Sequence, residues 1–477
     1  MTNALTDTTG ILNTDTSQTD NMSQWRDLAT KTLRGDNFST LEHITEDGIK
    51  RGPLFTQGPS THVANSETDH LAGRPWHLGV MIDHPHINGA NRDILDDLEG
   101  GGSALSLNID PRGTYGIAVR SMSDIERLLS GVYTSLVPIH LVPSGNFETM
   151  ALFAAYFERQ EDQENISLNL SYVPGPHDED QLLALSHWVT THTYKGKALN
   201  INGAAMHEEG ASPAQELAFM AARLVSYLRT LLKDHDINTA LAMVDVRLAA
   251  DQDAHFNIIK FRAARLMWAK IVDEFGGTHA DMSLHAISSL RMMAHQDPWA
   301  NLLRLNAASF GAALGGADVV TLLPFTHKTG PKLDLATPFA RRLSRNIQLL
   351  QMEETHLGHV QDPAHGSYMH ESLTQDLAEK SWEIFQDIEN KGGWFKAFDG
   401  FIAHVQTMQA QRTEKIKNGE IKLVGINQYV KADVRKAEVL RRPSTAQRTG
   451  EIINAKDFET ARQQAKNGYL LPLSGEE

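Results

Sequence analysis

The stretch ISLNLSYVPGPHDEDQLLALSHWVTTHTYKGKALNINGAAM, residues 166–206, holds the pattern that decides the fold. Its two ends, 166–173 and 198–206, alternate apolar and polar residues, as a half-buried β-strand does. The segment 180–192 between them has the apolar spacing of an amphipathic helix. A strand, a helix and a second strand in this order predict a parallel βαβ unit.

The same alternation recurs along most of the chain. Further strands are predicted at 103–110, 138–144, 239–248, 282–289 and 318–325, with a weaker eighth at 359–363. Further helices are predicted at 147–159, 213–233, 256–275, 298–314, 337–356 and 374–391. Eight strands that alternate with helices favour a closed barrel over an open doubly wound sheet. We therefore predict an α/β protein with a (β/α)8 TIM barrel, an N-terminal extended arm and a short C-terminal helical tail.

The flanks of the barrel differ from it in composition. Residues 1–22 are mostly Thr, Asn, Asp and Ser, so they are predicted to form a disordered tail. We expect residues 23–76 to form an arm for subunit contact, 77–400 the barrel, and 401–477 a C-terminal helical extension.

Overall composition excludes several classes of protein. The 477 residues carry a formal net charge of −15, which disfavours nucleic acid as a partner, and the 41% of hydrophobic residues exclude a wholly disordered chain. The absence of Cys excludes disulfides, thiolate metal sites and a Cys nucleophile. No apolar run approaches the ~18 residues of a membrane-spanning helix, and no signal-peptide pattern opens the chain. These features predict a cytoplasmic protein that does not insert into a membrane.

The strands predict a polar barrel interior. The outward face of a barrel strand is covered by helices and must be apolar, so the residues of the other parity point inward. A polar interior is either a closed hydrogen-bond network or a hydrated ligand channel, and both interpretations stay open at this point. The predicted interior residues are Ser106, Asn108, Asp110, Ser167, Asn169, Ser171, Asn200 and Asn202, together with His285 and with His140 or one of its neighbours.

Other motifs point to turns more than to sites. The run Gly100-Gly101-Gly102 precedes a strand, whereas a phosphate-binding loop follows one. His207-Glu208-Glu209 and the pair His356 and His359 lack the spacing of a zinc protease, so we predict no metal site. The loop 362–367 follows the predicted eighth strand, where barrels keep their sites, although its Pro and Gly favour a plain turn.

From Phe261 the chain reads FRAARLMWAKIVDEFGG, then DPWANLLRLNAASFGAALGGADVVTLLPF, then FARRLSRNIQLLQMEETHLGHVQDPAHGSYMHESLTQDLAEKSWEIFQDIENKGG, and later LVGINQY. These segments resemble the methylmalonyl-CoA mutase family, and in particular its small, non-catalytic subunit. The likeness spans roughly Trp25 to Tyr429. It implies an arm that embraces a partner subunit and a (β/α)8 barrel in an enzyme that interconverts methylmalonyl-CoA and succinyl-CoA with adenosylcobalamin.

The resemblance also shows two departures from catalytic members. Those members carry a Ser-Gly-Tyr-His-Met-Gln-Glu-Ala-Gly-like segment after a barrel strand, and its Tyr and His lie beside the cobalamin and the thioester. The matching positions here are Ala204 and Ala205, and the substrate-positioning Tyr of a further Arg-Gln-Tyr element is matched by Met81. We therefore assign no catalytic residue, no cofactor-binding residue and no metal ligand to this chain.

The second departure concerns the cobalamin-binding domain of the family, marked by Asp-x-His-x-x-Gly. The nearest string, Asp253-Ala254-His255, has Ile258 in place of the Gly and is predicted to open a barrel helix. Only 48 residues follow Tyr429, so no such domain is expected in 401–477.

Together these features predict a catalytically silent subunit that forms a heterodimer with a large subunit carrying adenosylcobalamin. The alternative is the substrate-binding component of an acyl-CoA mutase whose cobalamin domain is a separate chain, with a CoA thioester in the polar interior. A stand-alone regulatory relative would differ only in its partner.

Overall fold

The computed structural model describes residues 18–34, 37–56, 58–59, 74–161, 163–192, 195–278, 281–327, 334–446 and 448–473. Residues 1–17 of the predicted disordered tail lie outside the described residues. The rest of that segment belongs to a helix, α1 (Gln18–Thr32), so the prediction of disorder was wrong for 18–22.

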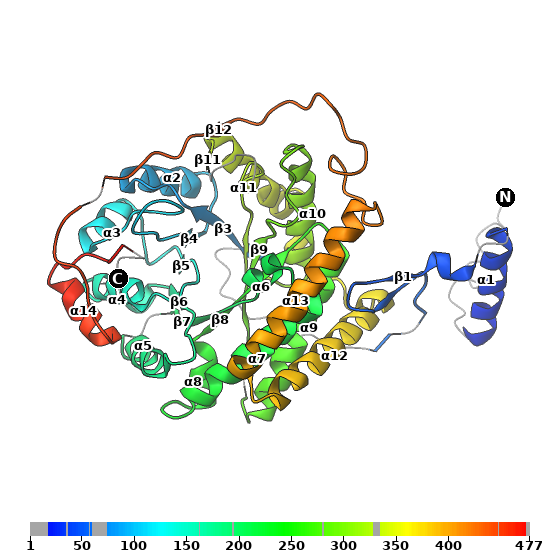
Figure 1. The fold of residues 1–477 in the computed structure, drawn as a ribbon, viewed down its shortest axis with the longest axis horizontal. Helices are drawn as coiled ribbons and strands as arrows, with labels where there is room; N and C mark the ends of the chain where they lie inside the picture. The colour runs from blue at the N-terminus through cyan, green and yellow to red at the C-terminus, as the bar shows by residue number, and fades with distance from the viewer. Residues whose placement is uncertain are drawn as a thin grey trace, which may run out of the picture.

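A closed parallel barrel forms the centre of the molecule (Figure 1). Each strand pairs in parallel with the next, and the last pairs with the first, which confirms the predicted (β/α)8 fold. The barrel strands are β3 (His77–Ile82), β4 (Ala104–Leu107), β5 (Ile139–Leu141), β6 (Leu168–Tyr172), β7 (Lys197–Asn202), β8 (Val244–Ala250), β9 (Ser283–Ser288) and β10 (Val319–Thr321).

The strand assignments needed three corrections. The first barrel strand, β3, was not predicted, because Gly79 interrupts a short HLGVMI run. The predicted eighth strand at 359–363 was wrong, since this region holds a 3-10 turn, η4 (Leu357–His359), and the eighth strand is β10. The loop 362–367 therefore does not follow a barrel strand. The predicted strand 239–248 begins instead with a short helix, α8 (Ile237–Ala242), which Asp236 caps.

Helices cover the outside of the barrel, and the seven predicted ones are confirmed with small differences at their ends. The unpredicted α2 (Ile87–Glu99) follows the unpredicted first strand. Buried Leu, Ile, Val and Ala side chains fill the layer between strands and helices. The helices after α2 are α3 (Met122–Leu128), α4 (Phe147–Phe157), α5 (Glu179–Thr191), α6 (Gly203–Glu209), α7 (Pro213–Leu231), α9 (Ala254–Glu274), α10 (Ala300–Leu314), α11 (Pro338–Glu353), α12 (Tyr368–Asn390) and α13 (Trp394–Lys417).

The N-terminal arm extends away from the barrel. Figure 1 shows α1 apart from the body, with a hairpin of β1 (His43–Ile44) and β2 (Lys50–Arg51) between the two. A short helix, η1 (Phe38–Leu41), packs Phe38 against Trp25 of α1. The carboxylate of Asp47, at the hairpin turn, accepts hydrogen bonds from the Ser212 hydroxyl and the Ala214 N–H at the start of α7. The hairpin is thereby fixed to the barrel.

After α13 the chain crosses the barrel as a strap, which we define as residues 418–446 and 448–457 (Figure 1). Within it β12 (Val439–Leu440) pairs with β11 (Leu335–Ala336), and beyond it α14 (Phe458–Lys466) packs against α4 and α5. The prediction of a helical extension over 401–477 therefore holds only for the end of α13 and for α14. Within the described ranges no helix combines the length and the apolar character needed to cross a membrane.

Candidate functional site

Two histidines meet across the barrel axis. His140 comes from β5 and His285 from β9, which lie on opposite sides of the closed strand order. Their ring centroids are 5.1 Å apart with the planes at 70°, and the residues are 4% and 1% exposed. The two imidazole rings therefore occupy the axis.

Polar neighbours form hydrogen bonds around these rings. His140 Nδ1 lies 2.7 Å from Asn169 Nδ2, and His285 Nε2 lies 2.8 Å from the Thr321 hydroxyl. Asp245 accepts from the Ser283 hydroxyl at 2.6 Å and from Asn200 Nδ2 at 3.0 Å. Ser106, in register with His140 on the adjoining strand, is also buried. The described interior thus holds a partial hydrogen-bond network, in which Ser106 Oγ, His140 Nε2 and Asn169 Oδ1 are buried without a hydrogen-bond partner.

Two cations, Lys197 and Arg247, lie near the buried carboxylate of Asp245. Burial raises the pKa of Asp245 to about 6, and the Ser283 hydrogen bond and the cations Lys197 and Arg247 oppose that shift. Burial lowers the pKa of Arg247 to about 10 and the pKa of His140 to about 3. Burial, Arg247 and the facing ring also lower the pKa of His285. Both imidazoles are therefore neutral at pH 7.

The same residues contain a set of metal-ligating groups. One ligand atom from each of His140, Asp245 and His285 lies within 4.8 Å of the others. Two neutral imidazoles and a carboxylate are a common ligand set for divalent metals. Lys197 and Arg247, however, already supply positive charge next to Asp245, and a divalent cation would be repelled by both. These two cations oppose the binding of a metal ion by the three groups.

The structure places three of the predicted interior residues in loops and caps away from the axis, so the prediction was wrong for them. Asn202 caps α6 by accepting from the Ala205 N–H, and Asn108 donates to the Tyr115 carbonyl in the loop after β4. Asp110 accepts from two backbone N–H groups of the same loop, Arg112 and Tyr115. These three residues shape the C-terminal mouth of the barrel.

Two serines complete the predicted set. The hydroxyl of Ser167, just before β6, donates to the Lys195 carbonyl at the opposite end of the barrel. Ser171 is buried with a left-handed backbone, φ 56°, where the pairing of β6 with β7 is irregular. This break in alternation explains why simple parity fails beyond Asn169.

Several network residues were missed by the sequence analysis. Lys197, Asp245, Arg247, Ser283 and Thr321 were not predicted to line the interior. The signal for two of them was present, because VDVRL at 244–248 alternates in the same way as the quoted stretch. Thr321 belongs to a three-residue strand, which is too short to show alternation.

The C-terminal mouth carries the three positions singled out by sequence. Met81 shares the parity of Gly79 on β3, opposite to the buried Leu78 and Val80. Ala204 and Ala205 lie in the first turn of α6, directly after β7. These three side chains offer neither a phenol, an imidazole nor a guanidinium.

His207, in α6 at the same mouth, is buried and hydrogen-bonded. It is 1% exposed, and its Nε2 lies 2.8 Å from the Ser289 hydroxyl. Its Nδ1 lies 3.8 Å from Glu216, too far for a hydrogen bond, and Glu216 instead pairs with Lys260 Nζ at 2.7 Å. Ser289, His207 and Glu216 therefore do not form a catalytic triad. The carboxylate of Glu216 pairs with the buried Lys260 and does not accept a hydrogen bond from His207.

A family model described as methylmalonyl-CoA mutase matches residues 55–472. A probable methylmalonyl-CoA mutase small subunit of Mycobacterium tuberculosis H37Rv is 36% identical over 421 residues, which cover 84% of this chain and 66% of that protein. The methylmalonyl-CoA mutase small subunit of Streptomyces virginiae is 32% identical over 88% of this chain and 70% of its own length. A methylmalonyl-CoA mutase of Cereibacter sphaeroides is 26% identical over 94% and 70%.

The chain spans 66% of the mycobacterial relative, slightly less than two thirds of its length. The family model covers most of the chain, including the whole barrel and the strap. On these matches, the chain belongs to the methylmalonyl-CoA mutase family.

Proposed function

We propose that this chain is the catalytically silent, structural subunit of a methylmalonyl-CoA mutase. It forms a heterodimer with a catalytic large subunit that binds adenosylcobalamin and interconverts methylmalonyl-CoA and succinyl-CoA. The identities support this assignment, since two relatives named as small subunits are more similar to the chain than the relative named simply as the mutase.

The contact of His140 with His285 carries the proposal. A CoA thioester threaded along the axis would have to displace two buried rings and break their hydrogen bonds to Asn169 and Thr321. Leaving buried polar partners unpaired costs about 1–3 kcal/mol each. The two rings therefore block the path along the axis between β5 and β9.

The mouth of the barrel does not fit adenosylcobalamin chemistry. The positions that resemble the family's functional Tyr and His are Ala204 and Ala205, and His207 cannot substitute because it is buried against Ser289. No step of the rearrangement is assigned to this chain.

The arm supplies a surface for the large subunit. Leu28 is 63% exposed on α1, which stands off the barrel, and Ile44 of β1 is 56% exposed in the hairpin. Apolar side chains on a projecting segment gain from contact with a partner. A cytoplasmic location accords with the absence of Cys.

Calorimetry separates this proposal from the substrate-binding alternative. The full chain is titrated with methylmalonyl-CoA, and the large subunit loaded with adenosylcobalamin is titrated in parallel as the positive control. We expect saturable binding to the large subunit and none to this chain at millimolar ligand. Micromolar binding to this chain would favour the substrate-binding component instead.

A further inference from the structure

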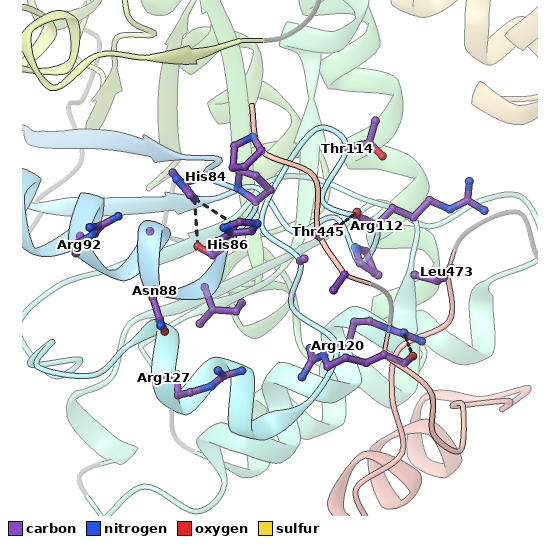
Figure 2. A pocket seen from close by; sticks show the side chains of 18 residues that line it. His84, His86, Asn88, Arg92, Arg112, Thr114, Arg120, Arg127, Thr445 and Leu473 are labelled. Carbon is purple, nitrogen blue, oxygen red and sulfur yellow. Dashed lines mark hydrogen bonds between the residues drawn. The ribbon is translucent and has the colours of Figure 1, made fainter. Parts of the chain in front are cut away.

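An arginine-rich cavity lies at the C-terminal ends of the first two barrel strands. Its volume is about 770 Å³, within the range of small-molecule sites, and Figure 2 shows its lining residues. The walls come from the loop after β3, the first turns of α2, the loop after β4, α3 and the strap. Barrel proteins place their ligand sites on this face.

The lining is basic although the protein is acidic. Five arginines line the cavity, and none of the described residues that line it is Asp or Glu. The whole chain has 59 acidic against 44 basic residues, so this cavity opposes the overall charge. The lining arginines are Arg92, Arg112, Arg120, Arg127 and Arg448.

Three of these arginines are held by hydrogen bonds or ion pairs within the protein. Arg120 is buried and donates to the carbonyls of Leu471, at 3.0 Å, and Arg448, at 2.7 Å. Arg127 and Arg448 both pair with the buried carboxylate of Asp124. These contacts fix the strap to α3 and the preceding loop.

The other two, Arg92 and Arg112, are exposed. Within the described part of the chain neither guanidinium forms an ion pair. The N-cap of α2, His86, makes no side-chain capping bond, so the first-turn N–H groups and the positive helix end add to the field of these cations. Guanidinium groups bind phosphate oxygens in bidentate geometry.

The strap forms one wall of the cavity. The Thr445 hydroxyl donates to the Arg112 carbonyl at 2.7 Å, and His86 Nε2 lies 2.9 Å from the Ser444 carbonyl. Figure 2 shows the strap passing between Arg112 and the helices that carry Arg92 and Arg127. A ligand in the cavity would therefore contact the barrel and the strap together.

We propose that this cavity binds a phosphorylated small molecule of about nucleotide size. The excess of guanidinium groups over carboxylates in the lining favours a multiply charged anion such as a diphosphate over a single carboxylate. The site lies beside the barrel axis, so the proposal is independent of the subunit role proposed above.

The test is a titration of the full chain with ADP and with inorganic pyrophosphate, and with adenosine as the uncharged comparison. We expect one saturable site for ADP and for pyrophosphate, with affinity that falls as salt rises, and none for adenosine. In the R92A/R112A variant the affinity falls at least tenfold. The matched control, R26A/R342A, removes two exposed arginines from α1 and α11 and keeps the affinity of the parent.

Hydrogen exchange then locates the bound anion. We expect ADP to slow exchange in segments 84–92, 111–127 and 443–446. Absence of saturable binding, equal binding to the R92A/R112A variant, binding of adenosine without pyrophosphate, or protection confined to other segments would each overturn the proposal.

Discussion

The imidazole rings of His140 and His285 face each other across the barrel axis with their centroids 5.1 Å apart. Each ring comes from a different side of the barrel, and each hydrogen-bonds to a neighbour on its own side. The contact joins opposite walls of the barrel through side chains alone. It also makes the stability of the fold depend on the two rings remaining neutral.

This contact predicts a pH dependence. Burial lowers the pKa of His140 to about 3, whereas an unfolded histidine titrates near 6.5. The unfolded state therefore binds more protons below pH 6.5, and the stability that neutral His140 contributes is complete above pH 6.5 and is lost as the pH falls. The expected loss is up to about 1.4 kcal/mol per pH unit.

The variant H140Q isolates this effect in urea unfolding at pH 7.0, 5.5 and 4.5. Asp245, whose pKa is raised to about 6, acts in the opposite sense between about pH 6 and 4, but it is present in both proteins. We expect the stability gap between parent and H140Q to narrow as the pH falls. The exposed-site control H404Q should show a constant gap, and a constant gap for H140Q would contradict a neutral buried ring.

A second prediction concerns the closure of the helical layer. Asp97 of α2 is 2% exposed and pairs with both Arg341 and Arg345 of α11, which joins the helix after the last strand to the helix after the first. D97N leaves two guanidiniums without their buried carboxylate, so we expect a loss of about 3–5 kcal/mol in urea unfolding. D96N, at the exposed neighbour, should stay within about 0.5 kcal/mol of the parent. Equal stability of the two variants would show that the pairing does not hold α2 to α11.

A third prediction concerns the pairing of β3 with β10. A Cβ added at Gly79 would lie 2.1 Å from the Thr321 hydroxyl on the paired strand, a residue that also bonds His285. G79A therefore forces these strands apart, and we expect a loss of about 2–3 kcal/mol in thermal and urea unfolding. G400A serves as the comparison, because a Cβ there meets open space in α13 and should stabilise by up to about 1 kcal/mol. If G79A left the stability unchanged, there would be more space between β3 and β10 than the structure shows.

The fourth prediction concerns the strap. Arg120 donates to carbonyls on both sides of α14, at Arg448 and Leu471, and hydrogen bonds from a charged donor contribute about 1.5–3 kcal/mol each. R120M should therefore speed hydrogen exchange in 448–473 at least tenfold while β5 to β9 keep their protection. R441M, at an exposed strap residue, should leave exchange unchanged. Uniform acceleration throughout the barrel in R120M would indicate global and not local loosening.

The sequence predicted what depends on local alternation. The strands around Leu168 and Leu199 were found because apolar and polar residues alternate along them, and this alternation also placed Asn169 and Asn200 toward the interior. The helix starting at Pro213 was found because its apolar residues have helical spacing, a pattern that needs only neighbouring residues.

What the sequence could not predict depends on closure and long-range contact. Because β3, which contains Gly79, was not recognised, the weak segment 359–363 was counted as the eighth strand. The meeting of His140 with His285 depends on which strands lie opposite each other, and no local pattern records that. The arginine-rich cavity was missed for the same reason, since Arg92 and Arg448 come together only when the strap crosses the barrel.

The most direct test of the central claim is a measurement of turnover from methylmalonyl-CoA to succinyl-CoA. The full chain is assayed alone with adenosylcobalamin, and again after assembly with the large subunit encoded in the same genome. We predict no turnover above background for the chain alone, and turnover by the complex that H140Q in this chain leaves unchanged. Turnover by the chain alone would contradict a catalytically silent subunit.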